Sequence, residues 1–172
     1  RDFIWNDNLP IDMDGHGTHV AGTIGQLTND GIGTAGIAFN VRLMPVKVIA
    51  SDWDDISPAA SPDGRKLAFS SNRTGFWDLY LLDLTSGEVT QLTDTPNYEG
   101  APAWSPDGSF IAYESYINEN LEIVVGPADD PLKNPVRLTN SPAADYSPAW
   151  APGGRQIAFI SNGEVMLADL DK

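Results

Sequence analysis

The sequence predicts a mainly β protein made of three four-stranded antiparallel units, preceded by a small α/β segment. Three observations support this prediction. A seven-residue element recurs three times after residue 50, a Leu-Thr pair occurs twice at the repeat spacing, and the 172-residue chain holds 16 Gly and 13 Pro. Because Gly and Pro are the residues of tight turns, this composition favours short strands in close succession.

The seven-residue element sets the period of the repeat. It reads Pro-Ala-Ala-Ser-Pro-Asp-Gly at residues 58–64, Pro-Ala-Trp-Ser-Pro-Asp-Gly at 102–108 and Pro-Ala-Trp-Ala-Pro-Gly-Gly at 148–154. The pair Leu92-Thr93 returns as Leu138-Thr139. The Ser-Pro-Asp-Gly step predicts a tight turn, since Pro presets φ, Asp bonds its own backbone and Gly accepts a positive φ.

Apolar strands are expected after each of these turns. The first set is 66–71, 110–115 and 156–161, whose nearly continuous apolar character indicates strands covered on both faces. The next strands are expected at 77–82, 121–125 and 164–168, and outer strands at 89–93 and 135–139. The third copy reaches residue 172 before an outer strand. We therefore expect units at about 51–95, 96–140 and 141–172.

Four strands in about 45 residues is the period of a propeller blade. The pattern Pro-Ala-Trp-Ser-Pro-Asp-Gly, followed in the first copy by Ser-Asn-Arg-Thr-Gly-Phe-Trp-Asp-Leu-Tyr at 71–80, resembles the TolB-type WD-like propeller repeat over residues 51–172. Two positions depart from it. Ala60 replaces the Trp of the other copies, and Gly153 replaces the turn Asp in the third.

Three blades form an incomplete ring, because propellers use four to eight. Exposed strand edges are templates for pairing with other strands. Three explanations are open: further blades are missing from this chain, the sheets stack in another way, or the open blade edges pair with another chain. We expect open blade edges to bind a protein partner or a second copy of the chain. Trp77, Trp104 and Trp150 could form an exposed binding stripe, but the shared repeat position of two of them favours a structural contact between blades.

Residues 1–50 have a different character. Small residues follow Asp14, with Val20 and Ile24 four apart, which predicts a closely packed helix with Asp14 as its N-cap. The β-branched run at 41–49 predicts a buried strand, interrupted by a Pro. This segment is expected to be an α/β fragment.

The run His-Gly-Thr-His-Val-Ala-Gly-Thr at 16–23, with its flanks at 3–14 and 36–48, resembles the histidine motif of subtilisin-like serine peptidases. The resemblance implies that His16 is the general base and that His19 is a packing residue. A histidine base needs an orienting carboxylate and a nucleophile. No Asp-Ser/Thr-Gly or Gly-Thr-Ser-Met-Ala element occurs in the chain. His16 is therefore expected to be inactive in this chain alone.

Other interpretations of the acidic and histidine residues near the N-terminus are less favoured. His16 and His19 could share a metal with Asp12 or Asp14, but the usual i, i+4 pair with Glu is absent. Asp7, Asp12 and Asp14 lack the calcium-loop pattern. No metal and no cofactor are expected.

The composition argues against nucleic-acid binding and against a membrane span. The chain has 10 basic and 24 acidic residues, a net charge of −14, and the acid excess lies mainly after residue 50. A negative surface repels phosphate, so nucleic acid is not an expected partner. No stretch is long and apolar enough for a membrane span, and no signal peptide is present.

The sequence as a whole favours a non-catalytic interaction or scaffold protein that is a subunit of a larger assembly. The alternative is a subtilisin-like endopeptidase fragment whose Asp and Ser lie outside this chain. Cys is absent, and both families that the chain resembles are largely secreted or periplasmic. Secretion or a periplasmic location is therefore expected by resemblance.

Overall fold

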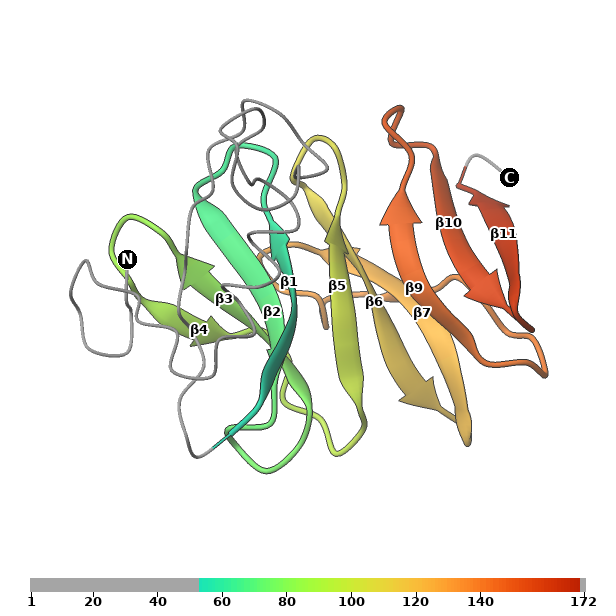
Figure 1. Cartoon of the computed structure of the whole chain (residues 1–172), viewed down its shortest axis with the longest axis horizontal. Helices are drawn as coiled ribbons and strands as arrows, with labels where there is room; N and C mark the ends of the chain where they lie inside the picture. Colours follow the sequence, from blue (N-terminus) through green and yellow to red (C-terminus); the bar gives the residue numbers. More distant parts are fainter. Residues whose placement is uncertain (1–52, 171–172) are drawn as a thin grey trace, which may run out of the picture. The chain divides into compact units, whose positions relative to one another are not determined.

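The computed structural model describes residues 53–170, which belong to the second of the chain's two units, residues 50–172. These residues form eleven strands in three antiparallel sheets, which follow one another along the chain and lie side by side (Figure 1). The protein is thus mainly β in its described part. The α/β segment expected at residues 1–50 lies outside the described residues, as does the boundary expected at residue 50.

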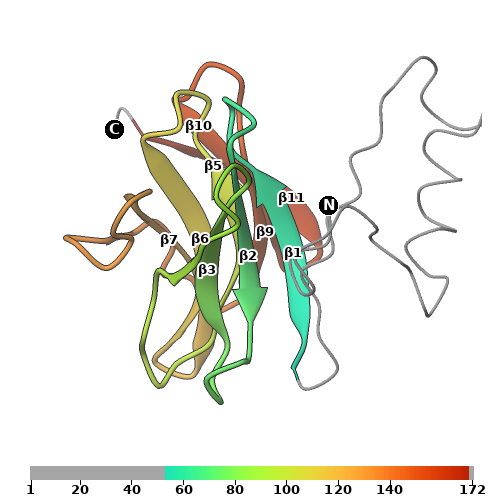
Figure 2. The same ribbon diagram turned by 90° about the vertical axis from the view of Figure 1, so that its left-hand side faces the viewer.

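The first two sheets each have four strands in chain order. The first consists of β1 (Asp55–Ala60), β2 (Lys66–Ser71), β3 (Asp78–Asp83) and β4 (Val89–Gln91). The second consists of β5 (Glu99–Trp104), β6 (Phe110–Ile117), β7 (Asn120–Pro127) and β8 (Val136–Arg137). The view in Figure 2, turned by 90°, shows β1, β2 and β3 of the first sheet beside one another. Both sheets confirm the expected four-stranded unit.

The third sheet has three strands within residues 53–170. They are β9 (Asp145–Trp150), β10 (Gln156–Ser161) and β11 (Glu164–Asp169), in the order β11-β10-β9. Within residues 53–170 the third copy therefore shows three strands instead of the four of a complete unit, as expected for a copy that reaches residue 172 before an outer strand.

Each predicted turn closes as expected. The amide N–H of Gly64 donates to the main-chain oxygen of Ser61 at 2.9 Å, and Gly108 bonds Ser105 in the same way. Both glycines have φ near +70°, which an L side chain rarely adopts. The third turn forms without the Asp, because Gly154 makes the same main-chain bond.

A side-chain bond strengthens the first two turns. The Ser61 hydroxyl donates to Asp63 Oδ1 at 2.6 Å, and Ser105 donates to Asp107 at the same distance. These hydrogen bonds lower the pKa of Asp63 and of Asp107 below 3.8. The third turn has Ala and Gly at the corresponding positions, so it depends on main-chain bonds alone.

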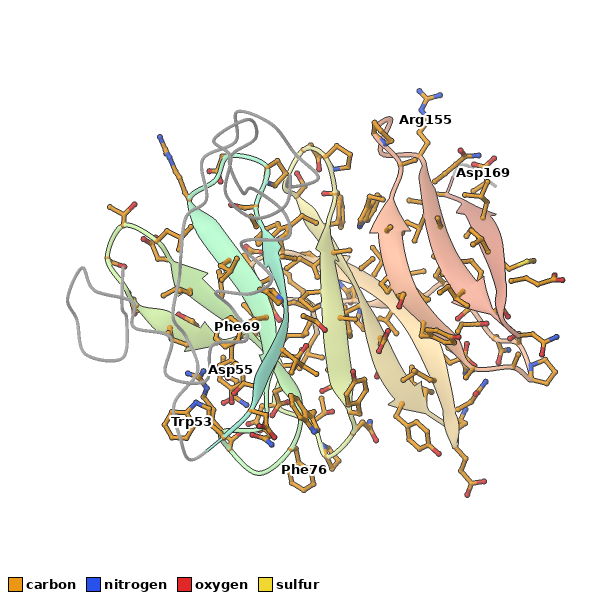
Figure 3. All side chains as sticks on the ribbon, in the orientation of Figure 1. Trp53, Asp55, Phe69, Phe76, Arg155 and Asp169 are labelled. Atoms are coloured by element: carbon orange, nitrogen blue, oxygen red, sulfur yellow. The ribbon has the colours of Figure 1, made fainter. Side chains whose placement is uncertain are left out.

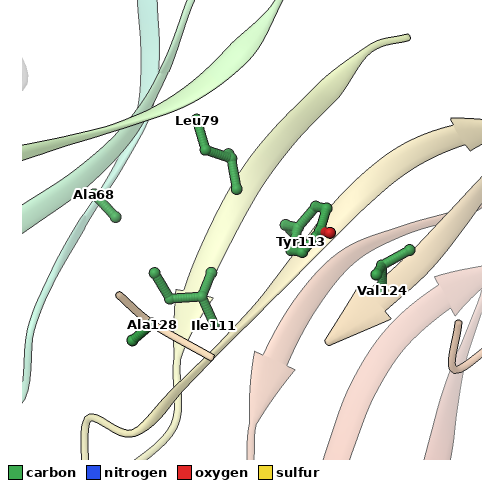
Figure 4. Close-up of a cluster of buried hydrophobic side chains, with 6 residues drawn as sticks. All are labelled: Ala68, Leu79, Ile111, Tyr113, Val124 and Ala128. Carbon is green, nitrogen blue, oxygen red and sulfur yellow. The ribbon is translucent and has the colours of Figure 1, made fainter. Parts of the chain in front are cut away.

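The main core lies between the first two sheets. Leu79 from the first sheet and Ile111 from the second are fully buried, and Tyr113 and Val124 lie beside them (Figure 4). Ile157 and Phe159 occupy the corresponding positions of the third sheet and are also buried. The second and third sheets thus each bury one apolar face against the sheet that precedes them.

Candidate interaction surface

A tryptophan joins the second sheet to the first and another joins the third sheet to the second. The indole N–H of Trp104 donates to the main-chain oxygen of Ala59 at 3.0 Å. Trp150 donates to Ala103 at the same distance. Both side chains are half-buried, and their repeated bond confirms the prediction that they are structural contacts between blades. Ala60 stands at this position in the first sheet, so β1 has no such donor.

A backbone bulge forms a second contact between sheets. Ala101 and Ser147 precede prolines in β5 and β9 and have φ of +46° and +56°, where the strand register shifts. The amide N–H of Ala101 donates to Ser70 Oγ at 3.1 Å, and that of Ser147 donates to Glu114 Oε1 at 2.7 Å. Because a bulge frees one N–H from the ladder, it can bond the neighbouring sheet.

Arg73 bonds β1, the first strand of the first sheet, through an ion pair. Arg73 Nη2 lies 2.9 Å from Asp55 Oδ1, and Asp55 is buried. The guanidinium lies 5.1 Å from the ring centroid of Phe69 and 4.7 Å from that of Tyr80. Figure 3 labels Asp55 and Phe69 on neighbouring strands. Cation–π attraction adds to the ion pair here.

A buried threonine ends the outer strand of each four-stranded sheet. Thr93 Oγ1 accepts the amide N–H of Leu79 at 2.8 Å and donates to Asp78 Oδ1 at 3.3 Å. In the second sheet, Thr139 Oγ1 accepts from Ile123 at 2.9 Å and donates to Glu122 Oε2 at 2.7 Å. The hydroxyl takes the place of a main-chain carbonyl, which explains why β4 and β8 end before the predicted 93 and 139.

The residue two positions before each threonine bonds the same carboxylate. Gln91 Nε2 donates to Asp78 Oδ2 at 3.1 Å. Arg137 Nη2 forms an ion pair with Glu122 Oε1 at 2.8 Å. Glu122 is fully buried, so this pairing satisfies a charge that would otherwise be costly to bury.

In the third sheet, the strand that corresponds to β3 and β7 is β11, and its apolar side chains are exposed. The register places Asp78 opposite Ser71, Glu122 opposite Ser115 and Glu164 opposite Ser161. The residues that follow the three carboxylates are therefore equivalent, yet Leu79 and Ile123 are 0% exposed and Val165 is 76% exposed. Leu167 is 65% exposed.

The exposed side chains form one continuous surface. Side chains two residues apart on a strand share a face, so Val165 and Leu167 lie together, and their register partners Ile160 and Ala158 lie beside them on β10. In the first two sheets this face contacts the next sheet. Among residues 53–170, no strand pairs with the free edge of β11 (Figure 3). We call these four residues, with the free edge of β11, the β11 surface.

Comparison with known protein families identifies the repeat. The model of the TolB beta propeller domain matches residues 44–165, most of the chain. The chain belongs to the TolB beta propeller domain family. The model of the subtilase family matches residues 2–61. Both resemblances expected from the sequence are thereby confirmed.

Individual relatives match parts of this TolB-family chain. It is 43% identical over 67 residues to the uncharacterized peptidase YuxL of Bacillus subtilis, covering 38% of this chain and 10% of the relative. It is 53% identical over 34 residues to an extracellular basic protease of Dichelobacter nodosus, covering 20% of this chain and 6% of the relative. The chain thus spans a tenth or less of these two curated relatives.

A solved structure supports the propeller assignment. The described sheets superpose on TolB from Acinetobacter baumannii with a TM-score of 0.64 and 30% identity, covering 72% of this chain and 31% of the other. The three sheets therefore resemble TolB propeller blades.

The structure does not place the histidine and acidic site residues that the sequence predicted near the N-terminus. His16, His19 and the acidic residues Asp7, Asp12 and Asp14 lie outside the described residues of this TolB-family chain. Within residues 53–170, no group of three or more His, Asp or Glu side chains is placed to hold a metal ion. No helix there is long and apolar enough to cross a membrane.

The sequence predicted open blade edges as interaction sites, but it did not single out the β11 surface. A signal was present, because an acidic residue occupies the same repeat position at or near the start of the third strand of every copy: Asp78, Glu122 and Glu164. This position would have linked the Leu-Thr pairs of the first two copies to Asp78 and Glu122, which Thr93 and Thr139 bond in the structure.

Proposed function

We propose that the chain is a non-catalytic interaction or scaffold protein that joins a larger assembly through the β11 surface. The observation that carries this proposal is the exposure of Val165 beside the complete burial of Leu79 and Ile123 at the same repeat position. Burial of apolar area contributes about 25 cal/mol per Å². An exposed apolar face next to an unpaired edge therefore favours association with another polypeptide.

The repeat itself supports this function. In the first two sheets, the same face and edge are covered by the next sheet and by an outer strand. The third sheet therefore exposes the same apolar face and strand edge that the first two sheets use for contacts within the chain. A secreted or periplasmic location is part of the proposal, supported by the likeness of one segment to an extracellular protease.

Sedimentation velocity of the purified full chain tests this function. Self-association is measured, because an exposed apolar surface can also bind a second copy of the chain. We expect mass to rise with protein concentration. The double variant Val165→Lys/Leu167→Lys should remain monomeric, because two charges oppose burial of this face. Val136→Lys is the matched control, since Val136 is 61% exposed on β8 and lies outside the β11 surface.

Two results would contradict the function. The first is a wild-type chain that stays monomeric at all accessible concentrations. The second is an association that the control substitution weakens as much as the double variant does.

The match of residues 2–61 to the subtilase family favours a second function, peptide-bond hydrolysis with His16 as general base. A fluorophosphonate probe tests it on the purified chain. Labelling of a serine that is lost in His16→Ala would support the peptidase and overturn the non-catalytic proposal. Absence of labelling would support the non-catalytic proposal for this chain.

A further inference from the structure

We propose that the contact between the first and second sheets is a pH-sensitive switch, closed while the Glu99 carboxyl holds a proton and loosened when that proton is lost. The contact forms where β5 begins, because the amide N–H of Glu99 donates to the main-chain oxygen of Trp77 at 2.8 Å. This inference goes beyond the proposed function, since it concerns a contact inside the described sheets and does not involve the β11 surface.

The Glu99 carboxyl is buried with one oxygen unbonded. The residue is 2% exposed. Its Oε1 accepts the hydroxyl of Thr95 at 2.7 Å and that of Ser115 at 3.4 Å. Its Oε2 is buried and has no hydrogen-bond partner. Because a buried charge without a partner costs far more than a neutral carboxyl, these surroundings favour the protonated acid.

A second buried carboxylate, Asp78 at the start of β3, lies close to Glu99. Burial raises the pKa of Glu99 above 4.5, and the charge of Asp78 raises it further. Four donors bond Asp78, namely the side chains of Thr74, Gln91 and Thr93 and the amide N–H of Thr95. Since these donors stabilise a charge on Asp78, the proton of the pair belongs to Glu99.

The other titratable groups around Glu99 are neutral or already paired. On β6, burial and the charge of Glu99 raise the pKa of Tyr113, so its phenol stays neutral. On β7, Glu122 lies on the same face of the sheet, because Glu99 and Glu122 are both register partners of Ser115. The Arg137 ion pair holds Glu122. None of these groups supplies Glu99 with a positive charge.

The first strands of the other two sheets show what Glu99 lacks. Asp55 and Asp145 begin β1 and β9 as Glu99 begins β5, and all three are buried. Asp55 forms an ion pair with Arg73. The Ser141 hydroxyl lies 3.2 Å and 3.1 Å from the two carboxylate oxygens of Asp145. Of these three acids in the described part of the chain, Glu99 alone keeps a buried oxygen without a partner.

The two contacts between sheets also differ in charge. Arg137 neutralises Glu122 in the second sheet, whereas Gln91 at the same repeat position gives Asp78 a neutral donor. Within residues 53–170, no Arg or Lys forms an ion pair with Asp78 or Glu99. A proton on Glu99 therefore removes one of two buried negative charges from the first contact, as Arg137 offsets one in the second.

The proton also sets the direction of the switch. Because the folded pKa of Glu99 lies above the ordinary 4.5, the contact is most stable below 4.5 and weakens as pH rises toward the folded value. Each pH unit in this interval shifts the equilibrium toward the open contact by up to about tenfold. The effect levels off above the folded pKa, where both states have lost the proton.

Two measurements on the full chain test the proposal. Carboxyl NMR gives the titration midpoint of Glu99, and hydrogen exchange, corrected for the intrinsic rate at each pH, gives the protection factor of its amide. We expect a midpoint above 4.5 and a protection factor that falls with rising pH until the midpoint is passed. In Glu99→Gln, which has a neutral side chain of the same shape, protection should stay constant over this range.

A change of donor in the first sheet tests the role of charge. Gln91→Arg gives Asp78 the kind of ion pair that Glu122 has, so it should lower the Glu99 midpoint by about one pH unit. Thr90→Arg is the matched control, because Thr90 is exposed on the opposite face of β4, and it should leave the midpoint unchanged.

Three results would overturn the proposal. The first is a Glu99 midpoint at or below 4.5, since the buried carboxyl would then hold no extra proton in the folded chain. The second is a wild-type protection factor that follows that of Glu99→Gln at every pH. The third is a Glu99 midpoint that Gln91→Arg moves no further than Thr90→Arg does.

Discussion

The indole N–H of Trp150 bonds the main-chain oxygen of Ala103 across 3.0 Å and joins the third sheet to the second. Trp150→Phe keeps most of the ring but removes the donor. We expect it to lower the free energy of unfolding by about 1 kcal/mol. Urea denaturation measures this change, with Tyr116→Phe, an exposed ring, as control. Equal effects of the two substitutions would show that the bond contributes nothing specific.

Thr93 supports both a buried amide and a buried carboxylate. Thr93→Val preserves the β-branched shape but leaves the Leu79 amide and one bond of Asp78 unsatisfied. The expected loss of stability is about 1–3 kcal/mol. Thr90→Val on the same strand is the matched control, because Thr90 is exposed, and it should stay within about 0.5 kcal/mol of the wild type. A smaller loss for Thr93 than for Thr90 would refute the bridging role.

The turn aspartates Asp63 and Asp107 should make the stability of the chain depend on pH in a definite direction. Hydrogen bonding by Ser105 and by the backbone lowers the pKa of Asp107 in the folded chain. Its stabilising contribution is therefore complete above the unfolded value of 3.8 and is lost as pH falls through the lower folded value. Carboxyl NMR titration should place the midpoint below 3.8, and the stability difference between wild type and Asp107→Ala should vanish in acid. A midpoint above 3.8 would contradict the assignment.

Glu99 should make stability depend on pH in the opposite direction. Its side chain is buried, and this burial raises its pKa above 4.5, although Thr95 donates to it at 2.7 Å. Because the folded chain holds this proton more tightly than the unfolded chain, stability falls as pH rises from 4.5 through the folded pKa. Relative to Glu99→Gln, the wild type should lose stability over this range. Glu88→Gln, at an exposed position, should show no such trend.

The repeat made much of this fold predictable from the sequence. The Ser-Pro-Asp-Gly turns, the apolar strands and the tryptophan contacts all follow from spacing and residue type. The recurrence of Thr93 and Thr139 was visible in the sequence but their role was not, because spacing alone does not show that a hydroxyl takes the place of a main-chain carbonyl. Periodicity also identifies β11 as a strand without showing what covers it. Val165 is exposed because, within residues 53–170, β11 has neither the outer strand nor the following sheet that cover Leu79 and Ile123.

Hydrogen exchange at the Val165 amide tests association through the β11 surface. We predict fast exchange in dilute chain and slow exchange once the chain associates, with the Leu79 and Ile123 amides slow throughout. Fast exchange at Val165 in every associated state would contradict association through this surface.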